Sequence, residues 1–275
     1  MYDESSDFIH HDTEIEQMLQ YLSYCGLTPA PNGLYLDVGG GPGMHVWKLL
    51  PLCSHMFVAD IIDYSNLYDG HFLHLLYEKH ERHGRRMDLS RVTFVRSDAQ
   101  AQIFRECMFD FVFSFNMFEH VPNPAAAMDE ILRVLKPGGV FYLQFDLIWT
   151  SPAGNHFSHY VPEPWAHLLC STEEFVAQMR RASASEADIS DFVYNMNRWP
   201  LRSFLDLFQR IADSKAVRME KLEYWAMNRE EEPHSKHPNF ARLLKLGYSE
   251  QDLVVRGIHV CGRRIGGPGE ISALS

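Results

Sequence analysis

The sequence predicts an α/β fold in which a seven-stranded, mostly parallel sheet is covered by helices on both faces. Short apolar runs alternate with segments of helical spacing from residue 34 to residue 145, which is the pattern of strands that alternate with crossover helices. The apolar runs lack alternating polar residues, as expected for parallel strands buried on both faces. With 275 residues, of which 46% are hydrophobic, the chain can bury the core of one such domain.

The elements follow one another in a regular order up to residue 147. A leading helix is expected over residues 12–24, because apolar residues recur there at helical spacing and Gly26 and Pro29 follow as stop signals. Helical spacing also predicts helices over residues 44–50, 67–83 and 124–135. Five strands are predicted at the apolar runs, over residues 34–38, 56–59, 92–95, 109–115 and 140–145.

Residues 148–200 interrupt this rhythm. The segment is rich in Pro, His, Trp and Tyr and contains one predicted helix, over residues 172–182. We interpret it as an inserted cap after the fifth strand, over the sheet edge where open α/β sheets bind ligands. A helix over residues 200–212 and two strands over 216–225 and 253–264 follow, and the polar segment that contains Glu230–Pro233 lets these two strands pair antiparallel.

The whole chain, residues 1–275, is thus predicted to be a single domain. Its expected parts are an N-terminal helical segment (1–32), a ligand-binding core (33–147), the cap (148–200) and the C-terminal part of the sheet (201–275).

Composition excludes several classes of function. The formal net charge of −11 disfavours a nucleic-acid partner, since polyanions are repelled by an acidic surface. The five cysteines are scattered and form no CxxC pair, which indicates a reducing, cytoplasmic location. The first residues are acidic, and no apolar stretch is long enough to span a membrane. The expected partner is therefore a small molecule, with neither a nucleic acid nor a membrane involved.

A glycine-rich turn after the first predicted strand indicates a ligand. Glycines at Gly39, Gly41 and Gly43 let the backbone approach a ligand closely. A dinucleotide fingerprint would need its third small residue at position 44, which is Met44, so the spacing disfavours a nicotinamide cofactor. Asp37, at the end of the strand, supplies a carboxylate that can accept a hydrogen bond from an ammonium group. A tight turn without a ligand is the simpler alternative.

Two further acids close predicted strands. Asp60 ends the second strand, where a carboxylate can bind both hydroxyls of a ribose. Asp98 follows the third strand and can accept a hydrogen bond from an exocyclic amine. Each acid alone could be a turn or helix cap, but three acids at the carboxyl ends of three strands indicate one shared site.

Five motifs follow one another in order along the chain: Leu36–Gly43, Asp60, Ser97–Ala99, Phe109–Val112 with Asn116–Val121, and Ile131–Gly139. With these motifs the sequence resembles the class I S-adenosylmethionine-dependent methyltransferases, in particular the methyltransferase type 11 or ubiquinone-biosynthesis-like group. The resemblance implies a Rossmann-like fold and S-adenosyl-L-methionine as the cofactor. It further implies that Gly39, Gly41 and Gly43 pack against the methionine and ribose portions, with Asp37 near the amino group. Asp60 would bind the ribose, Asp98 the adenine amine, and Asn116 would border the sulfonium.

Histidines in the cap are candidates for the catalytic base. His156, His159 and His167 cluster between residues 155 and 167, and His120 follows the fourth strand. A neutral imidazole near pH 7 suits the removal of a hydroxyl proton, although loop histidines often only hydrogen-bond the backbone. A metal bound by these histidines and Asp146 is an alternative that we do not assign. Other paired histidines, including His10 and His11, give no assignable signal, and no metal site is expected.

We expect an S-adenosylmethionine-dependent methyltransferase that acts on a small molecule. A hydroxyl of a sugar or secondary metabolite is the favoured acceptor, because aromatic residues beside histidines suit sugar or ring faces together with a proton acceptor. Methylation of nitrogen or carbon, a non-catalytic module that only binds the cofactor, and a nicotinamide-dependent oxidoreductase remain as alternatives.

Overall fold

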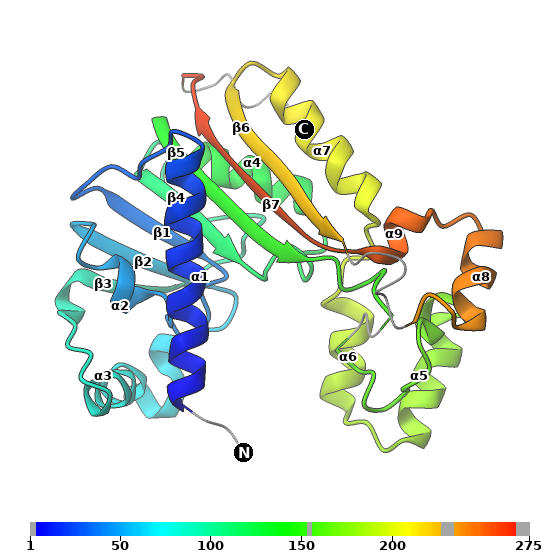
Figure 1. The fold of residues 1–275 in the computed structure, drawn as a ribbon. Coiled ribbons are helices and arrows are strands. Elements are labelled where there is room, and N and C mark those ends of the chain that lie inside the picture. Colours follow the sequence, from blue (N-terminus) through cyan, green and yellow to red (C-terminus); the bar gives the residue numbers. More distant parts are fainter. Residues whose placement is uncertain (1–3, 153–155, 227–233, 268–275) are drawn as a thin grey trace.

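A computed structural model describes residues 4–152, 156–226 and 234–267 of the chain (Figure 1). The acidic segment Glu230–Pro233, which the sequence places before the last strand, lies outside the described residues, as does Asn155 of the cap.

One seven-stranded sheet, in the order β3-β2-β1-β4-β5-β7-β6, forms the centre of the molecule. The first five strands pair in parallel, and β7 lies antiparallel between β5 and β6. The predicted sheet and its antiparallel closing pair are thereby confirmed. The strands are β1 Leu34–Val38, β2 His55–Asp60, β3 Val92–Arg96, β4 Phe109–Phe115, β5 Leu135–Asp146, β6 Val217–Ala226 and β7 Val255–Arg264.

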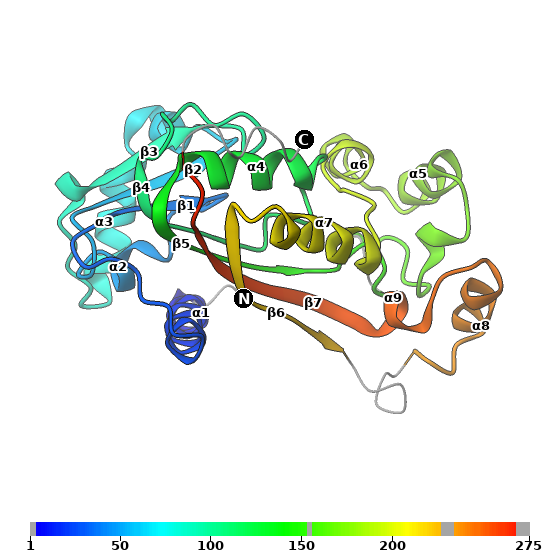
Figure 2. The same ribbon diagram turned by 90° about the horizontal axis from the view of Figure 1, so that it is seen from above.

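Helices cover both faces of the sheet (Figure 2). On one face, α1 and α2 pack through residues such as Ile15 and Val46. On the other face, α4 and α7 pack through residues such as Ile131 and Phe208. Burial of these two apolar stripes is the main source of stability in such a layered fold. The helices are α1 Glu4–Tyr24, α2 Val46–Leu49, α3 Phe72–Arg82, α4 Pro124–Val134, α5 Thr172–Arg181, α6 Glu186–Tyr194, α7 Leu201–Asp213, α8 Pro238–Lys245 and α9 Glu250–Val254.

The segment after β5 forms a helical cap beyond the end of that strand (Figure 1). Helices α5 and α6 share an apolar cluster built around Phe175 and Phe192. The buried indole of Trp165 packs on Phe240 of α8, with ring centroids 5.6 Å apart, and donates a hydrogen bond to the carbonyl of Thr150. The cap therefore also draws on residues 238–254, which the sequence assigned to the sheet alone.

Three differences from the predicted elements have local causes. Helix α1 begins at Glu4 and not at residue 12, since its first turns pack Phe8 against α3 through ring contacts with His80 and His83. Helix α2 is confined to Val46–Leu49 because the turn before it continues past Gly43. Helices α6 and α8 were not predicted, although Ser185 caps α6 and Pro238 opens α8, and both are helix start signals.

Candidate functional site

The carboxyl ends of β1 to β4 meet at one edge of the sheet and line a cavity of about 730 Å³. The four residues predicted at these strand ends that line it are Gly39, Asp60, Asp98 and Asn116. Ligands bind at this edge in open α/β sheets because the strand order reverses there. The cap closes the other side of the cavity with His156, Phe157, Asp191, Asn195 and Met196.

The turn after β1 needs glycine at its predicted positions. Gly39, Gly41 and Gly43 have φ values of 73°, 51° and 77°, a region that favours glycine because other residues carry a Cβ. At Gly39 a Cβ would lie 2.4 Å from Cγ of Met117, whereas at Gly41 the nearest atom would be the Tyr64 hydroxyl at 3.6 Å. The turn is therefore packed tightly beneath Gly39 and has open space beside Gly41.

Asp60 fixes the turn and also lines the cavity. Its carboxylate accepts hydrogen bonds from the amide of Gly41 at 3.0 Å and from the amide of Ile62 at 2.9 Å. The side chain remains half-buried at the cavity wall. Each carboxylate oxygen has two lone pairs, so both oxygens retain acceptor capacity toward a ligand.

Asp98 follows β3 and Asn116 follows β4, the two strands that flank β2 and β1 in the sheet. Asp98 is exposed and accepts a hydrogen bond from the amide of Gln100 at 2.9 Å, as an Asx turn does. Asn116 has a φ of 49°, and its backbone N–H donates a hydrogen bond to the backbone carbonyl of Gln144 at 2.8 Å. A non-glycine residue in the left-handed region is held there by its surroundings, and such positions cluster at functional sites.

Asp37 lies beneath the turn, fully buried. Its Oδ2 is 3.2 Å from Nδ1 of His45, and Nε2 of His45 is 3.1 Å from Oε2 of Glu14 in α1. Burial lowers the pKa of His45, but hydrogen bonds to the two carboxylates outweigh burial and raise it to about 9. Asp37 is not among the described residues that line the cavity. Its contact with a cofactor amino group stays a prediction.

Two of the four predicted histidines reach the cavity. His120 and His156 both line it and stack on each other, with ring centroids 5.3 Å apart and ring planes inclined by 17°. Nδ1 of His120 lies 3.1 Å from the carbonyl oxygen of Asn195. Desolvation, aided by the neighbouring His120, lowers the pKa of His156.

The other two histidines lie apart from the described cavity lining. His159 is exposed and packs on Tyr160, with ring centroids 4.0 Å apart. His167 is buried, its Nε2 donates to the carbonyl of Trp149 at 2.7 Å, and burial lowers its pKa to about 4. The clustering of three histidines in sequence therefore does not place them at one site.

Sequence reasoning missed the residues that α6 and its C-terminal end contribute. Asp191, Asn195 and Met196 line the cavity, but the helix that carries them was not predicted. It also missed Glu119, whose side chain is almost completely buried. Burial, with the charge of Asp146 nearby, raises the pKa of Glu119 to about 8.

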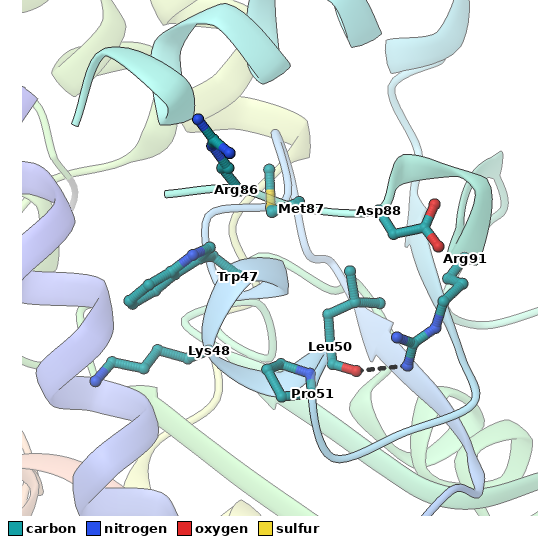
Figure 3. Close-up of a pocket in the computed structure, with 8 residues that line it drawn as sticks. All are labelled: Trp47, Lys48, Leu50, Pro51, Arg86, Met87, Asp88 and Arg91. Atoms are coloured by element: carbon teal, nitrogen blue, oxygen red, sulfur yellow. Dashed lines mark hydrogen bonds between the residues drawn. The ribbon is translucent and has the colours of Figure 1, made fainter. Parts of the chain in front are cut away.

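A second cavity, of about 360 Å³, lies between α2 and the segment that precedes β3 (Figure 3). Trp47 and Leu50 form one wall and Met87 another, and Arg91 donates a hydrogen bond to the carbonyl of Leu50 at 2.7 Å. Because residues 86–91 lead into β3, this cavity lies near the amino end of that strand, opposite the edge that carries Asp60 and Asp98.

Residues 36–143 match the family model of a methyltransferase domain. The chain carries a class I methyltransferase domain. The match spans β1 to β5 and therefore includes all four strands whose ends line the larger cavity. S-adenosyl-L-methionine, the cofactor that the sequence predicts, is the methyl donor of this family, and the match disfavours the nicotinamide alternative.

Curated relatives of the domain are described as uncharacterized methyltransferases. One from Mycolicibacterium vanbaalenii is 34% identical over 131 residues, which are 46% of this chain and 45% of the relative. One from Mycobacteroides abscessus is 29% identical over 164 residues, which are 57% of this chain and 54% of the relative. The chain thus spans about half the length of the curated relatives it matches.

Solved structures share the fold of the methyltransferase domain. A candidate methyltransferase from Bacillus halodurans has a TM-score of 0.50 at 18% identity and covers 89% of this chain and 96% of its own. A phosphoethanolamine N-methyltransferase from Haemonchus contortus, bound to phosphomonomethylethanolamine and S-adenosylhomocysteine, has a TM-score of 0.50 at 16% identity. The match covers 91% of this chain and 53% of that structure's chain. No helix among the described residues is long and apolar enough to cross a membrane.

Proposed function

We propose that this protein transfers a methyl group from S-adenosylmethionine to a hydroxyl group of a small molecule, such as a sugar or secondary metabolite, held in the larger cavity. The observation that carries the proposal is the stacked pair of His120, which follows β4, and His156 of the cap, because both line the same cavity as Gly39 and Asp60. The cavity thus offers cofactor-binding groups together with a proton acceptor.

The residues of the sheet edge suit the cofactor. Gly41 leaves open space beside the turn, where an added Cβ would meet only the Tyr64 hydroxyl within 4 Å. Asp60 presents a half-buried carboxylate with free lone pairs, which suits ribose hydroxyls. Asp98 offers an exposed carboxylate for the adenine amine, and Asn116, which would border the sulfonium, lines the same cavity. When bound, S-adenosylmethionine supplies a methyl group activated by its sulfonium.

The histidine pair would take the proton that the acceptor loses. In a neutral ring, donation from Nδ1 of His120 to the Asn195 carbonyl places the lone pair on Nε2. Nε2 would then accept the proton that the acceptor hydroxyl loses when it is methylated. The lowered pKa of His156 keeps its ring neutral at pH 7, so it adds no second positive charge beside His120. Positioned base catalysis of this kind contributes roughly 10²–10⁴-fold in rate.

The test is a methyl-transfer assay with isotopically labelled S-adenosylmethionine and a panel of small hydroxyl and amine acceptors. The variants His120→Ala and His156→Ala are compared with His159→Ala, a matched control from the same loop region that lies outside the described cavity lining. We expect kcat to fall by about 10²-fold in at least one of the first two, with cofactor Kd within about threefold and the control unchanged.

Three outcomes contradict the proposal. Near-normal kcat in both cavity variants would remove histidine base catalysis and favour an acceptor that needs no base. Methyl transfer to an amine or carbon, with no hydroxyl acceptor used, would place the enzyme in a different class. Binding of S-adenosylmethionine without transfer to any acceptor in the panel or in fractionated cell extracts would favour a non-catalytic binding module.

A further inference from the structure

A cluster of histidines surrounds the buried carboxylate of Glu14 between α1 and the glycine-rich turn. Nδ1 of His11 lies 2.8 Å from Oε2 of Glu14, and Nε2 of His10 lies 3.4 Å from Oε1. Nε2 of His45 lies 3.1 Å from Oε2. The ligand atoms of His10, His11 and Glu14 all lie within 4.8 Å of one another.

We propose that His10, His11 and Glu14, whose ligand atoms all lie within 4.8 Å of one another, form a zinc-binding site on α1 beside the glycine-rich turn. Two imidazole nitrogens and one carboxylate oxygen are a ligand set that Zn²⁺ accepts, with a water molecule as the fourth ligand of a tetrahedral site. Ligand atoms placed about 2.0–2.1 Å from zinc at tetrahedral corners are about 3.3 Å apart. The contacts of His10 and His11 to Glu14, at 3.4 and 2.8 Å, are close to this spacing.

The surroundings of the histidines support the site independently of the spacing. Metal-binding histidines usually donate their second ring nitrogen to a carboxylate, which fixes the ring orientation. Nε2 of His11 lies 3.5 Å from Oδ1 of Asp7, so Nδ1, the nitrogen that faces Glu14, is the one left to face the metal. His45 holds the carboxylate of Glu14 in place, because its Nε2 lies 3.1 Å from Oε2 of Glu14 and its Nδ1 lies 3.2 Å from Oδ2 of Asp37.

Burial and access are also suitable. The side chain of Glu14 is only 7% exposed and contacts His45, which is 8% exposed, so this ligand is held rigidly inside the protein. The side chain of His10 is 65% exposed and gives a cation a path from solvent. His45 comes two residues after Gly43, and Asp37 precedes the turn, so the Asp37–His45 contact closes the turn at its base. Zinc bound to Glu14 would therefore lie next to the Glu14–His45 contact that connects α1 to this base.

The test is zinc binding by the full chain, free of affinity tags and stripped of metal, measured by competition with a chromophoric chelator. We expect one zinc ion per chain and affinities at least about tenfold weaker for His10→Ala and His11→Ala, because each removes one ligand. His74→Ala is the matched control, since His74 pairs with Glu78 at 3.2 Å on the exposed side of α3 in the same i,i+4 arrangement. Its affinity should equal that of the wild type.

His10→Ala keeps the result interpretable if variants of buried residues fail to fold. It removes an exposed side chain and leaves the contacts of Glu14 with His11 and His45 in place, so circular dichroism should match the wild type. Cobalt substituted for zinc should give the visible absorption of a four-coordinate ion. The proposal is overturned if the wild type binds no more zinc than the His10→Ala/His11→Ala double variant, or if cobalt is six-coordinate. Neither measurement depends on methyl transfer.

Discussion

Replacing Gly39 or Gly41 by alanine separates two reasons why the turn after β1 requires glycine. Both residues have positive φ, at 73° and 51°, so both substitutions carry a backbone cost of about 1–2 kcal/mol. Part of that cost is offset, by about 0.4–1 kcal/mol, because alanine reduces the entropy of the unfolded chain. Gly41→Ala meets nothing closer than 3.6 Å, and we expect it to lose only about 1 kcal/mol of stability.

Gly39→Ala adds a steric cost that Gly41→Ala lacks. Its Cβ would lie 2.4 Å from Cγ and 2.7 Å from Cβ of Met117. The Cβ of Met117 is attached directly to the backbone and cannot move aside by a rotamer change, and the residue is buried. Overpacking of a core costs about 1–3 kcal/mol. We therefore expect Gly39→Ala to lose about 2–4 kcal/mol in total.

Urea denaturation, followed by tryptophan fluorescence and by circular dichroism, measures both losses. The linear extrapolation requires that the two probes coincide and that the m-value stays constant between variants. Adding Met117→Ala to Gly39→Ala should show a favourable coupling of about 0.5–3 kcal/mol, since it removes the Cγ contact. Equal losses for Gly39→Ala and Gly41→Ala, together with zero coupling to Met117, would refute the steric reasoning.

Three further predictions follow from buried or bridging side chains. Asp60→Ala should weaken S-adenosylmethionine binding at least about tenfold in calorimetry. Asp63→Ala should not, because Asp63 is a half-buried acid that is not among the described residues lining the cavity. An unchanged Kd for Asp60→Ala would remove its ribose role. Glu119 has a folded pKa of about 8 against an ordinary value of 4.5, so its folded form holds a proton that the unfolded chain has lost. The free energy of unfolding should therefore fall between about pH 4.5 and 8, by at most roughly 5 kcal/mol. Urea titrations at about pH 5 and pH 8.5 measure this fall, and Glu119→Gln should abolish the part that Glu119 causes. An equal fall in the wild type and in Glu119→Gln would contradict this. Trp165→Ala should cost about 3–5 kcal/mol, because it empties a fully buried site between the cap and α8, and a loss below 1 kcal/mol would show that the cap does not depend on it.

The sequence predicted the sheet well because each buried strand has a local signal. The run Phe109–Phe115 is almost entirely apolar and aromatic, and it forms β4 without a change of boundary. The acids Asp60 and Asp98 were found because the strands they follow were recognised, and the carboxyl ends of parallel strands share one edge. These inferences needed only short stretches of sequence and one topological rule.

The parts that escaped prediction depend on contacts between distant residues. Glu14 and His45 are 31 positions apart and meet only because α1 packs on α2. His120 and His156 stack across 36 positions, while His167, close to His156 in sequence, is turned to the carbonyl of Trp149. A cluster in sequence therefore gave a wrong expectation of a cluster in space, because an irregular segment does not fix the direction of its side chains.

The boundary of the family match divides the residues that line the cavity into two groups. The match ends at residue 143, within β5, so Gly39, Asp60 and Asn116 lie inside it and the cap residues lie beyond it. A shared methyl donor needs the same strand ends in every member, whereas acceptors differ. We therefore expect acceptor choice to depend on the cap residues that line the cavity, among them Asp191 and Met196. Asn195 would serve both proposed functions, because its carbonyl oxygen lies 3.1 Å from Nδ1 of His120 and the residue also lines the cavity.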